Sequence, residues 1–199
     1  MKLLLCTLCI SLLLFSCKKE NVLISQKQNT TSQTSQDFVK YIIYKGQQYC
    51  NQTAFVPIKY SELKFKVKFD STVIYTTALS ENQLDINKLY GFSDNDADHH
   101  QFSARFGWRW SNNALWLFGY TYNNGVRAFK ALGTVTIGTE NYCSIKVDAA
   151  SYRFTLNDVS DTMIRKSTTS QALGYKLYPY FGGNEVAPND INIWIKELL

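Results

Sequence analysis

The chain has 199 residues, with thirteen Tyr, twelve Phe and four Trp. This length suits one domain with a sizeable core, and the aromatic content favours strands. Lys and Arg total 21 against 16 Asp and Glu, a formal net charge of +5, without a basic run. The sequence therefore predicts no nucleic-acid partner. It also lacks a P-loop, a dinucleotide-binding glycine fingerprint, a Gly-x-Ser-x-Gly turn and Cys/His metal spacings.

The first 16 residues read MKLLLCTLCISLLLFS, with Lys2 before a short apolar run. This is typical of a secretory signal and too short for a permanent membrane span. Residues 14–17, LFSC, resemble the lipobox of bacterial lipoproteins, which implies cleavage before Cys17 and acylation of that cysteine. The acyl chains would anchor the protein to a lipid bilayer of the bacterial cell envelope, at the outer membrane, facing the periplasm or the surface. An ordinary secretory signal is the alternative.

Residues 17–36 are expected to form the lipidated cysteine and a flexible tether. The segment is rich in Gln, Ser, Thr and Asn and cannot bury enough apolar surface to fold. The folded domain is then residues 37–199. It contains Cys50 and Cys143, which either form a disulfide or are two free, buried thiols. We favour the free thiols, because strands far apart in sequence need not be neighbours.

The domain reads as a series of short extended runs separated by turns. Residues 63–69, LKFKVKF, alternate strictly and predict a half-buried strand, whereas Pro57 makes residues 55–60 either an edge strand or an irregular segment. Residues 79–88 are a longer loop with one helical turn near 80–83. The other predicted strands are 38–44, 73–78, 101–110, 114–122, 126–132, 134–137, 142–148, 151–157, 161–165, 173–181 and 190–197. Such spacing favours an all-β, antiparallel two-sheet β-sandwich or jelly roll.

The register of the central hairpins follows from their turns. Asn112-Asn113 and Asn124-Gly125 are tight-turn sequences, because Asn and Gly tolerate the positive φ that hairpin turns need. The first turn places Arg105 opposite Tyr120, and the second places Arg127 opposite Tyr122. The predicted inward-facing residues of the first strand are His100, Phe102, Ala104, Phe106, Trp108 and Trp110.

The opposite face of these strands is the predicted ligand-binding groove. Its residues are His99, Gln101, Arg105, Arg109, Trp116, Tyr120, Tyr122 and Arg127. Aromatic rings stack on the C–H faces of pyranose sugars, and guanidinium groups bind hydroxyls or uronate carboxylates. A polysaccharide is therefore the expected partner. Alternatively, a strand or loop covers these aromatic side chains.

An acidic loop precedes the first hairpin. Asp94, Asp96 and Asp98 alternate as hard-cation loops do, although the EF-hand pattern fails, so Ca²⁺ is the one cofactor considered. A solvated acidic loop is the alternative. His99 and His100 should point to opposite faces of a strand, which prevents them from binding one ion together. His99 is either a general acid or base, or a residue that orders its own loop.

Four segments carry a resemblance: residues 69–75 (FDSTVIY), 85–94 (DINKLYGFSD), 99–110 (HHQFSARFGWRW) and 178–183 (YPYFGG). Together they resemble a family of uncharacterised lipoproteins from Bacteroidota. The resemblance implies a concanavalin A-like, or alginate-lyase-like, jelly roll with one concave sheet face. The alginate-lyase motifs themselves are not matched: Arg105 is not followed by the Glu of Arg-x-Glu-x-Arg, and Tyr175 lacks the rest of Tyr-x-Lys-Ala-Gly. The lyase catalytic set is therefore not carried over.

The sequence predicts a non-catalytic, membrane-anchored lipoprotein that binds a glycan on the concave sheet face. One alternative is a jelly-roll polysaccharide lyase or glycoside hydrolase; a lyase would use His99 and Arg105 as catalytic residues. Another is a structural or accessory envelope lipoprotein with a protein partner.

Overall fold

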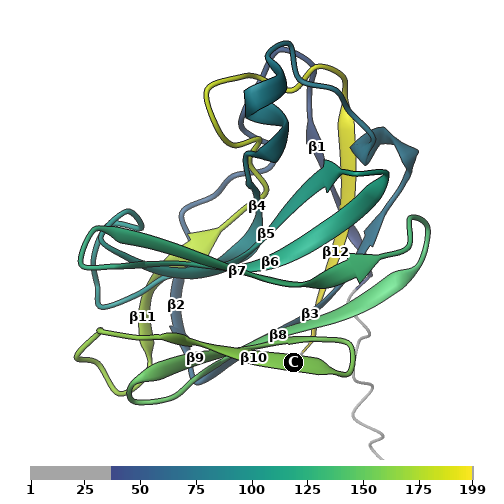
Figure 1. Ribbon diagram of the computed structural model, residues 1–199. Helices are drawn as coiled ribbons and strands as arrows, with labels where there is room; N and C mark the ends of the chain where they lie inside the picture. The colour runs from purple at the N-terminus through teal and green to yellow at the C-terminus, as the bar shows by residue number, and fades with distance from the viewer. Residues whose placement is uncertain (1–36, 199) are drawn as a thin grey trace, which may run out of the picture. The chain divides into compact units, whose positions relative to one another are not determined.

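The computed structural model describes residues 37–198, which form two antiparallel sheets of six strands each (Figure 1). The predicted signal peptide, the predicted acylation site Cys17 and the tether to residue 36 lie outside the described residues. Within residues 37–198, no helix has the length and apolar character needed to cross a bilayer. The predicted all-β, two-sheet jelly-roll class is confirmed.

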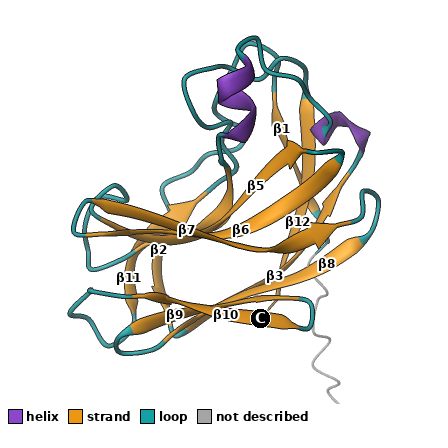
Figure 2. Ribbon diagram, in the orientation of Figure 1, coloured by secondary structure: helices purple, strands orange, loops and turns teal. Residues whose placement is uncertain are grey.

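The two sheets lie in facing layers, as Figure 2 shows. The first contains, in spatial order, β1 (Val39–Ile43), β12 (Ile191–Leu198), β3 (Glu62–Phe69), β8 (Glu140–Val147), β9 (Ser151–Leu156) and β10 (Val159–Ile164). The second contains β2 (Pro57–Tyr60), β11 (Ala172–Leu177), β4 (Asn87–Ser93), β5 (Phe102–Ser111), β6 (Ala114–Asn123) and β7 (Val126–Val135). Pro57 therefore lies in an edge strand, one of the two predicted alternatives.

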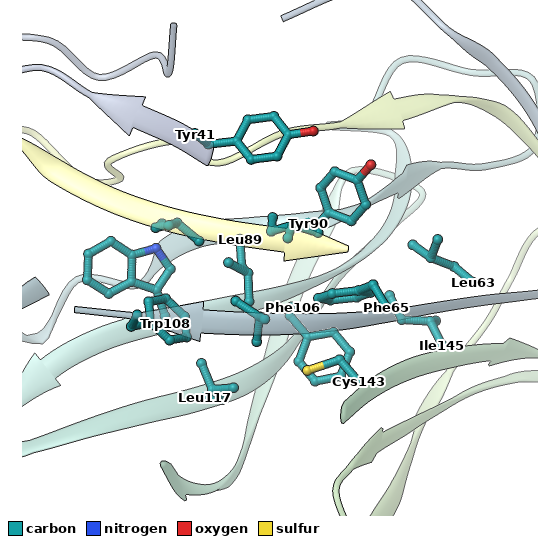
Figure 3. Close-up of a cluster of buried hydrophobic side chains, with 14 of the residues drawn as sticks. Tyr41, Leu63, Phe65, Leu89, Tyr90, Phe106, Trp108, Leu117, Cys143 and Ile145 are labelled. Carbon is teal, nitrogen blue, oxygen red and sulfur yellow. The ribbon is translucent and has the colours of Figure 1, made fainter. Parts of the chain in front are cut away.

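The core lies between the sheets and is rich in aromatic rings (Figure 3). Phe65 of β3 meets Phe106 of β5 edge to face, with ring centroids 5.5 Å apart, and Phe106 meets Phe154 of β9 at 5.4 Å. Each such pair contributes about 0.5–1.5 kcal/mol beyond the burial of its area. Cys50 and Cys143 are both buried and free, which confirms the favoured prediction for the two thiols.

The predicted hairpin register is confirmed. Asn112 and Asn113 adopt φ of 53° and 55°, and the β5–β6 hairpin pairs Arg105 with Tyr120. The following β6–β7 hairpin pairs Tyr122 with Arg127. These pairings direct Ala104, Phe106 and Trp108 into the core, and leave Arg105 and Tyr120 on the outer face of the second sheet.

Three strand predictions were wrong, one of which divided β7 (Val126–Val135) into separate strands at 126–132 and 134–137. Residues 73–78 are not a strand: the 3₁₀ helix η1 (Ser71–Val73) begins after Asp70, whose carboxylate accepts a hydrogen bond from the Thr72 amide, and irregular chain follows. The strand β4 lies where part of a loop was expected. A β-bulge between Lys88 and Gly91 sends two successive residues to the core side and hides the alternation. The predicted helical turn is confirmed as η2 (Ser80–Leu84).

Candidate functional site

A cavity of about 600 Å³ lies on the outer face of the second sheet. Side chains of β4, β5, β6 and β7 line one side of it. The others come from β11 and from three segments outside the strands, around residues 49–55, 99–100 and 178–183. The cavity therefore combines the predicted sheet face with chain that is remote from it in sequence.

The structure divides the predicted groove residues into two groups. His99, Arg105, Tyr120, Tyr122 and Arg127 line the cavity, whereas Gln101, Arg109 and Trp116 do not. Part of the predicted face thus lines a cavity, the part around Arg109 and Trp116 is covered, and Gln101 is exposed outside the cavity.

The covered half is closed by the end of η2 and Ile86. Arg109 donates from Nη1 to the Leu84 carbonyl oxygen at 2.8 Å, and its guanidinium lies 4.9 Å from the Phe118 ring centroid. Trp116 packs against a small buried cluster that contains Ile86 and Phe118. These two predicted groove residues thus hold the covering loop to the sheet.

Arg105 lies in the cavity wall with only 7% of its surface exposed. It forms no ion pair among the described residues, and its Nε is buried without a hydrogen-bond partner. Burial lowers the pKa of its guanidinium to about 10. Gly91 opposite makes room for it, because a Cβ there would overlap the backbone and Cβ of Arg105.

Lys88 adds a second, half-buried cation to the same cavity. Its Nζ donates to the Ile86 carbonyl oxygen and lies 4.6 Å from the Tyr120 ring centroid. Burial, followed by repulsion from Arg105 and Arg127, lowers the pKa of Lys88 to about 8. The lining residues include no carboxylate, so the cavity has a positive potential that its own walls do not neutralise.

His99 and Tyr175 form a hydrogen-bonded pair in the cavity wall. The Nδ1 of His99 lies 2.9 Å from the Tyr175 hydroxyl, which also accepts a hydrogen bond from the His99 amide at 3.1 Å. Burial, then the positive charges of Arg105 and His100, lower the pKa of the His99 imidazole. The pair thus sets a neutral imidazole beside a phenol, within the same cavity as Arg105.

The predicted orientation of the two histidines was wrong. β5 begins only at Phe102, so His99 and His100 lie in a turn, and their ring centroids are 4.2 Å apart. His100 is exposed, not inward-facing. Strand alternation does not apply in a turn, and the two imidazoles therefore lie side by side.

The three aspartates considered for a calcium ion or a solvated loop lie in different surroundings. Asp94 is fully buried: its Oδ2 accepts hydrogen bonds from Arg165 Nε at 2.8 Å and from the Tyr152 hydroxyl at 2.6 Å. Its carboxylate is thus already neutralised, and it does not converge with Asp96 and Asp98 on one ion.

Sequence reasoning missed several lining residues. Lys88 was missed because its strand was not recognised. Tyr49, Phe55 and Tyr180 were missed because they lie outside the hairpins, yet Tyr49 pairs with Tyr180 and Phe55 with Tyr175 in the cavity wall, with ring centroids 4.9 and 5.4 Å apart. Tyr49 is 69% exposed and Phe55 is 77% exposed, so these two rings form a solvent-exposed aromatic rim of the cavity. The aromatic run of residues 175–180, YKLYPY, was the available signal.

Comparison with known proteins identifies the fold alone. No protein-family model matches the chain, and no curated protein matches it. Among solved structures, an alginate lyase is similar at a TM-score of 0.55 and 8% identity, over 81% of this chain and 74% of that one. A glycoside hydrolase family 16 endo-glucanase from Bacteroides ovatus has a TM-score of 0.50 and 12% identity, over 82% of this chain and 81% of that one. The described domain therefore shares the jelly-roll fold of these proteins.

Proposed function

We propose that the domain binds an acidic polysaccharide in its cavity without cleaving it. The observation that carries the proposal is Arg105, a buried guanidinium that no carboxylate of the described chain neutralises. Burying an unpaired charge is costly, and such sites are retained where a ligand supplies the missing partner. A uronate carboxylate matches the guanidinium fork, and Lys88 lies close enough to Arg105 and Arg127 for their charges to lower its pKa.

The aromatic walls of the cavity support a sugar ligand. Tyr120, Tyr122 and Tyr175 line it, and the more exposed Tyr49 and Phe55 extend the lining toward solvent. Flat rings beside cationic donors suit pyranose rings that carry carboxylates. The two structural neighbours, an alginate lyase and an endo-glucanase, act on glycans, which agrees with such a ligand.

The location of the protein is part of the same proposal. Acylated Cys17 would anchor the chain in the outer membrane, and the tether of residues 18–36 would carry the domain away from the lipid surface. Membership of the Bacteroidota lipoprotein family and the side of the membrane that the domain faces remain predictions.

The proposal is tested by calorimetric titration of the protein with uronate oligosaccharides and with neutral glucans of equal length. We expect binding of the uronates and at least about tenfold weaker binding of the neutral chains, because a charge-assisted pair contributes roughly 1.5–3 kcal/mol. Arg127→Ala should weaken uronate binding, since Arg127 lines the cavity. The matched control is Arg153→Ala, an exposed arginine on β9 of the other sheet. Equal binding of charged and neutral chains, or equal effects of the two variants, would refute the proposal.

A lyase is the second candidate, because His99 and Tyr175 adjoin Arg105 in the cavity wall. In a lyase, the arginine neutralises the uronate carboxylate, a base removes the proton beside it, and an acid protonates the leaving glycosidic oxygen. The ultraviolet absorbance of the same titrated mixtures distinguishes a lyase from a binding protein, since the unsaturated product of a lyase absorbs there. A hydrolase is less well supported, because the described lining residues lack the carboxylate pair that glycoside hydrolases generally use.

Uronate affinity is expected to fall as the pH rises from 7 to 9. Lys88 has a pKa of about 8, so it is mostly charged at pH 7 and mostly neutral at pH 9, where its attraction for a carboxylate is lost. The charged or titratable groups that act on it are Arg105, Arg127 and Asp85, and Tyr120 lies beside it with a pKa of about 12. Titrations across this range should show the decline in the native protein and a flatter, weaker profile in Lys88→Met. An equal decline in Lys88→Met would assign the effect to another group.

A further inference from the structure

We propose that Asp98, His99 and His100, with the Tyr175 hydroxyl beside them, form a binding site for a divalent transition-metal ion such as Zn²⁺. The three residues lie in the turn that precedes β5, and Tyr175 lies on β11. His99, His100 and Tyr175 also line the cavity. Neither acidic-polysaccharide binding nor lysis requires this ion, so the inference stands apart from the proposed function.

The geometry of the three side chains carries the inference. Each offers one ligand atom, and these atoms lie within 4.8 Å of one another. The Nδ1 of His99 lies 3.7 Å from Asp98 Oδ2, and the Nδ1 of His100 lies 3.6 Å from Asp98 Oδ1. Both distances are too long for hydrogen bonds. They are close to the separation of about 3.4 Å between two ligands that each lie about 2.1 Å from one tetrahedral ion.

Tyr175 supplies a fourth donor from a different strand. Its hydroxyl oxygen lies 2.9 Å from His99 Nδ1 and 3.5 Å from Asp98 Oδ2. The phenol therefore lies beside two of the three ligand atoms and ties the turn to β11. The site thus draws on two segments that are remote in sequence.

The turn is held in place by its own hydrogen bonds. The Asp98 carbonyl oxygen accepts from the amides of Gln101 and Phe102 at 2.8 and 3.0 Å, and Asp98 Oδ1 accepts from the His100 amide at 2.8 Å. Asp98 Oδ2 takes no part in that last bond. Little backbone rearrangement is therefore needed to bring the side chains onto one ion.

The donor chemistry selects the class of metal. Two imidazoles, one carboxylate and one phenol suit Zn²⁺, Cu²⁺ or Ni²⁺, whereas Ca²⁺ and Mg²⁺ prefer sets of oxygen ligands. The bound ion would add positive charge beside Arg105 and hold His99 and Tyr175 in fixed positions. Metal binding would thus compete with any role of this pair in proton transfer.

The test is titration of the full-length protein with Zn²⁺, and separately with Ca²⁺, by calorimetry or with a competing chromophoric chelator. We expect one Zn²⁺ site of micromolar or tighter affinity and much weaker Ca²⁺ binding. His100→Ala should weaken Zn²⁺ binding at least about tenfold, because a ligand matters at least as much as the outer partners, whose loss costs about 10–100-fold. His100 is exposed, so this variant should fold normally, and its circular dichroism and melting temperature report whether it does.

Two further variants sharpen the test. Asp96→Asn removes an exposed carboxylate outside the cluster and should leave Zn²⁺ affinity unchanged. Tyr175→Phe should remove the tyrosinate-to-metal charge-transfer band expected of the Cu²⁺-loaded protein. Absence of Zn²⁺ binding, or equal affinity in native protein and His100→Ala, would overturn the inference. Because no glycan enters these measurements, their failure leaves the proposed function untouched.

Discussion

Arg105→Met is expected to stabilise the fold while it strongly weakens binding of acidic oligosaccharides. The native guanidinium is buried with its Nε unpaired, whereas a methionine fills the space of the arginine stem up to about Nε without a charge. Replacing buried charge by apolar side chains can raise the free energy of unfolding by about 1–4 kcal/mol, and we expect a gain in the lower part of that range. Loss of the guanidinium should weaken uronate binding by roughly 2–5 kcal/mol, or about 30-fold or more. Urea denaturation and calorimetric titration measure the two effects.

Arg109→Met is the matched control, because Arg109 lies four residues along the same strand, on the same face of the sheet. Its guanidinium is satisfied by the Leu84 carbonyl oxygen, by Ser111 Oγ at 3.2 Å and by the Phe118 ring. This variant should lower the free energy of unfolding and retain uronate binding. Changes of opposite sign in the free energy of unfolding of the two variants would distinguish a ligand-binding arginine from a structural one. If Arg105→Met destabilises the protein as Arg109→Met does, Arg105 has a structural role and the functional proposal loses its basis.

The hairpin register could be predicted from sequence because it depends on local chemistry. Asn112 and Asn113 form a two-residue turn, and alternation then determines which side chains share a face. A single strong turn signal thus correctly paired Arg105 with Tyr120. The predicted pairing is correct along the whole hairpin, because the β5–β6 register contains no bulge.

The cavity could not be predicted, because it depends on packing between remote segments. The loop near Leu84 covers one half of the sheet face, and residues 49–55 and 178–183 build walls over the other. The bulge at Lys88 also interrupts the alternation that would have revealed β4. Sequence periodicity records which face of a strand is buried, but it does not record which loop covers the opposite face.

Asp94 shows that the partner of a buried charge also cannot be predicted from local sequence. In sequence it is one of three alternating aspartates in an apparently solvated loop. In the structure it is buried with Arg165, which lies 71 residues away, and the Arg165 Nη2 also donates to Ser167 Oγ and Thr169 Oγ1 at 3.0 and 2.9 Å. Only the fold brings Asp94 next to Arg165, the arginine that neutralises its charge.

Asp94→Ala is expected to lower the free energy of unfolding at pH 7 by about 3–5 kcal/mol, because it leaves the fully buried Arg165 without its counter-charge. Burial alone would raise the pKa of Asp94, but hydrogen bonds from Arg165 and Tyr152 outweigh it and lower the pKa below 3.8. A carboxyl with a depressed folded-state pKa stabilises the fold above its unfolded pKa. That contribution is lost as the pH falls through the folded value. The stability difference between native protein and variant should therefore shrink in acid.

Asp161→Ala is the control for this prediction. Asp161 pairs with Lys130 at 2.7 Å, but both side chains are accessible to solvent, so removing the carboxylate should cost less than about 1 kcal/mol. The double variant Asp94→Leu/Arg165→Met should recover much of the loss from Asp94→Ala, because it removes both charges together. Urea denaturation of the variants at pH 7 measures all three values. If Asp94→Ala costs no more than Asp161→Ala, the buried pair does not stabilise the loop between β4 and β5.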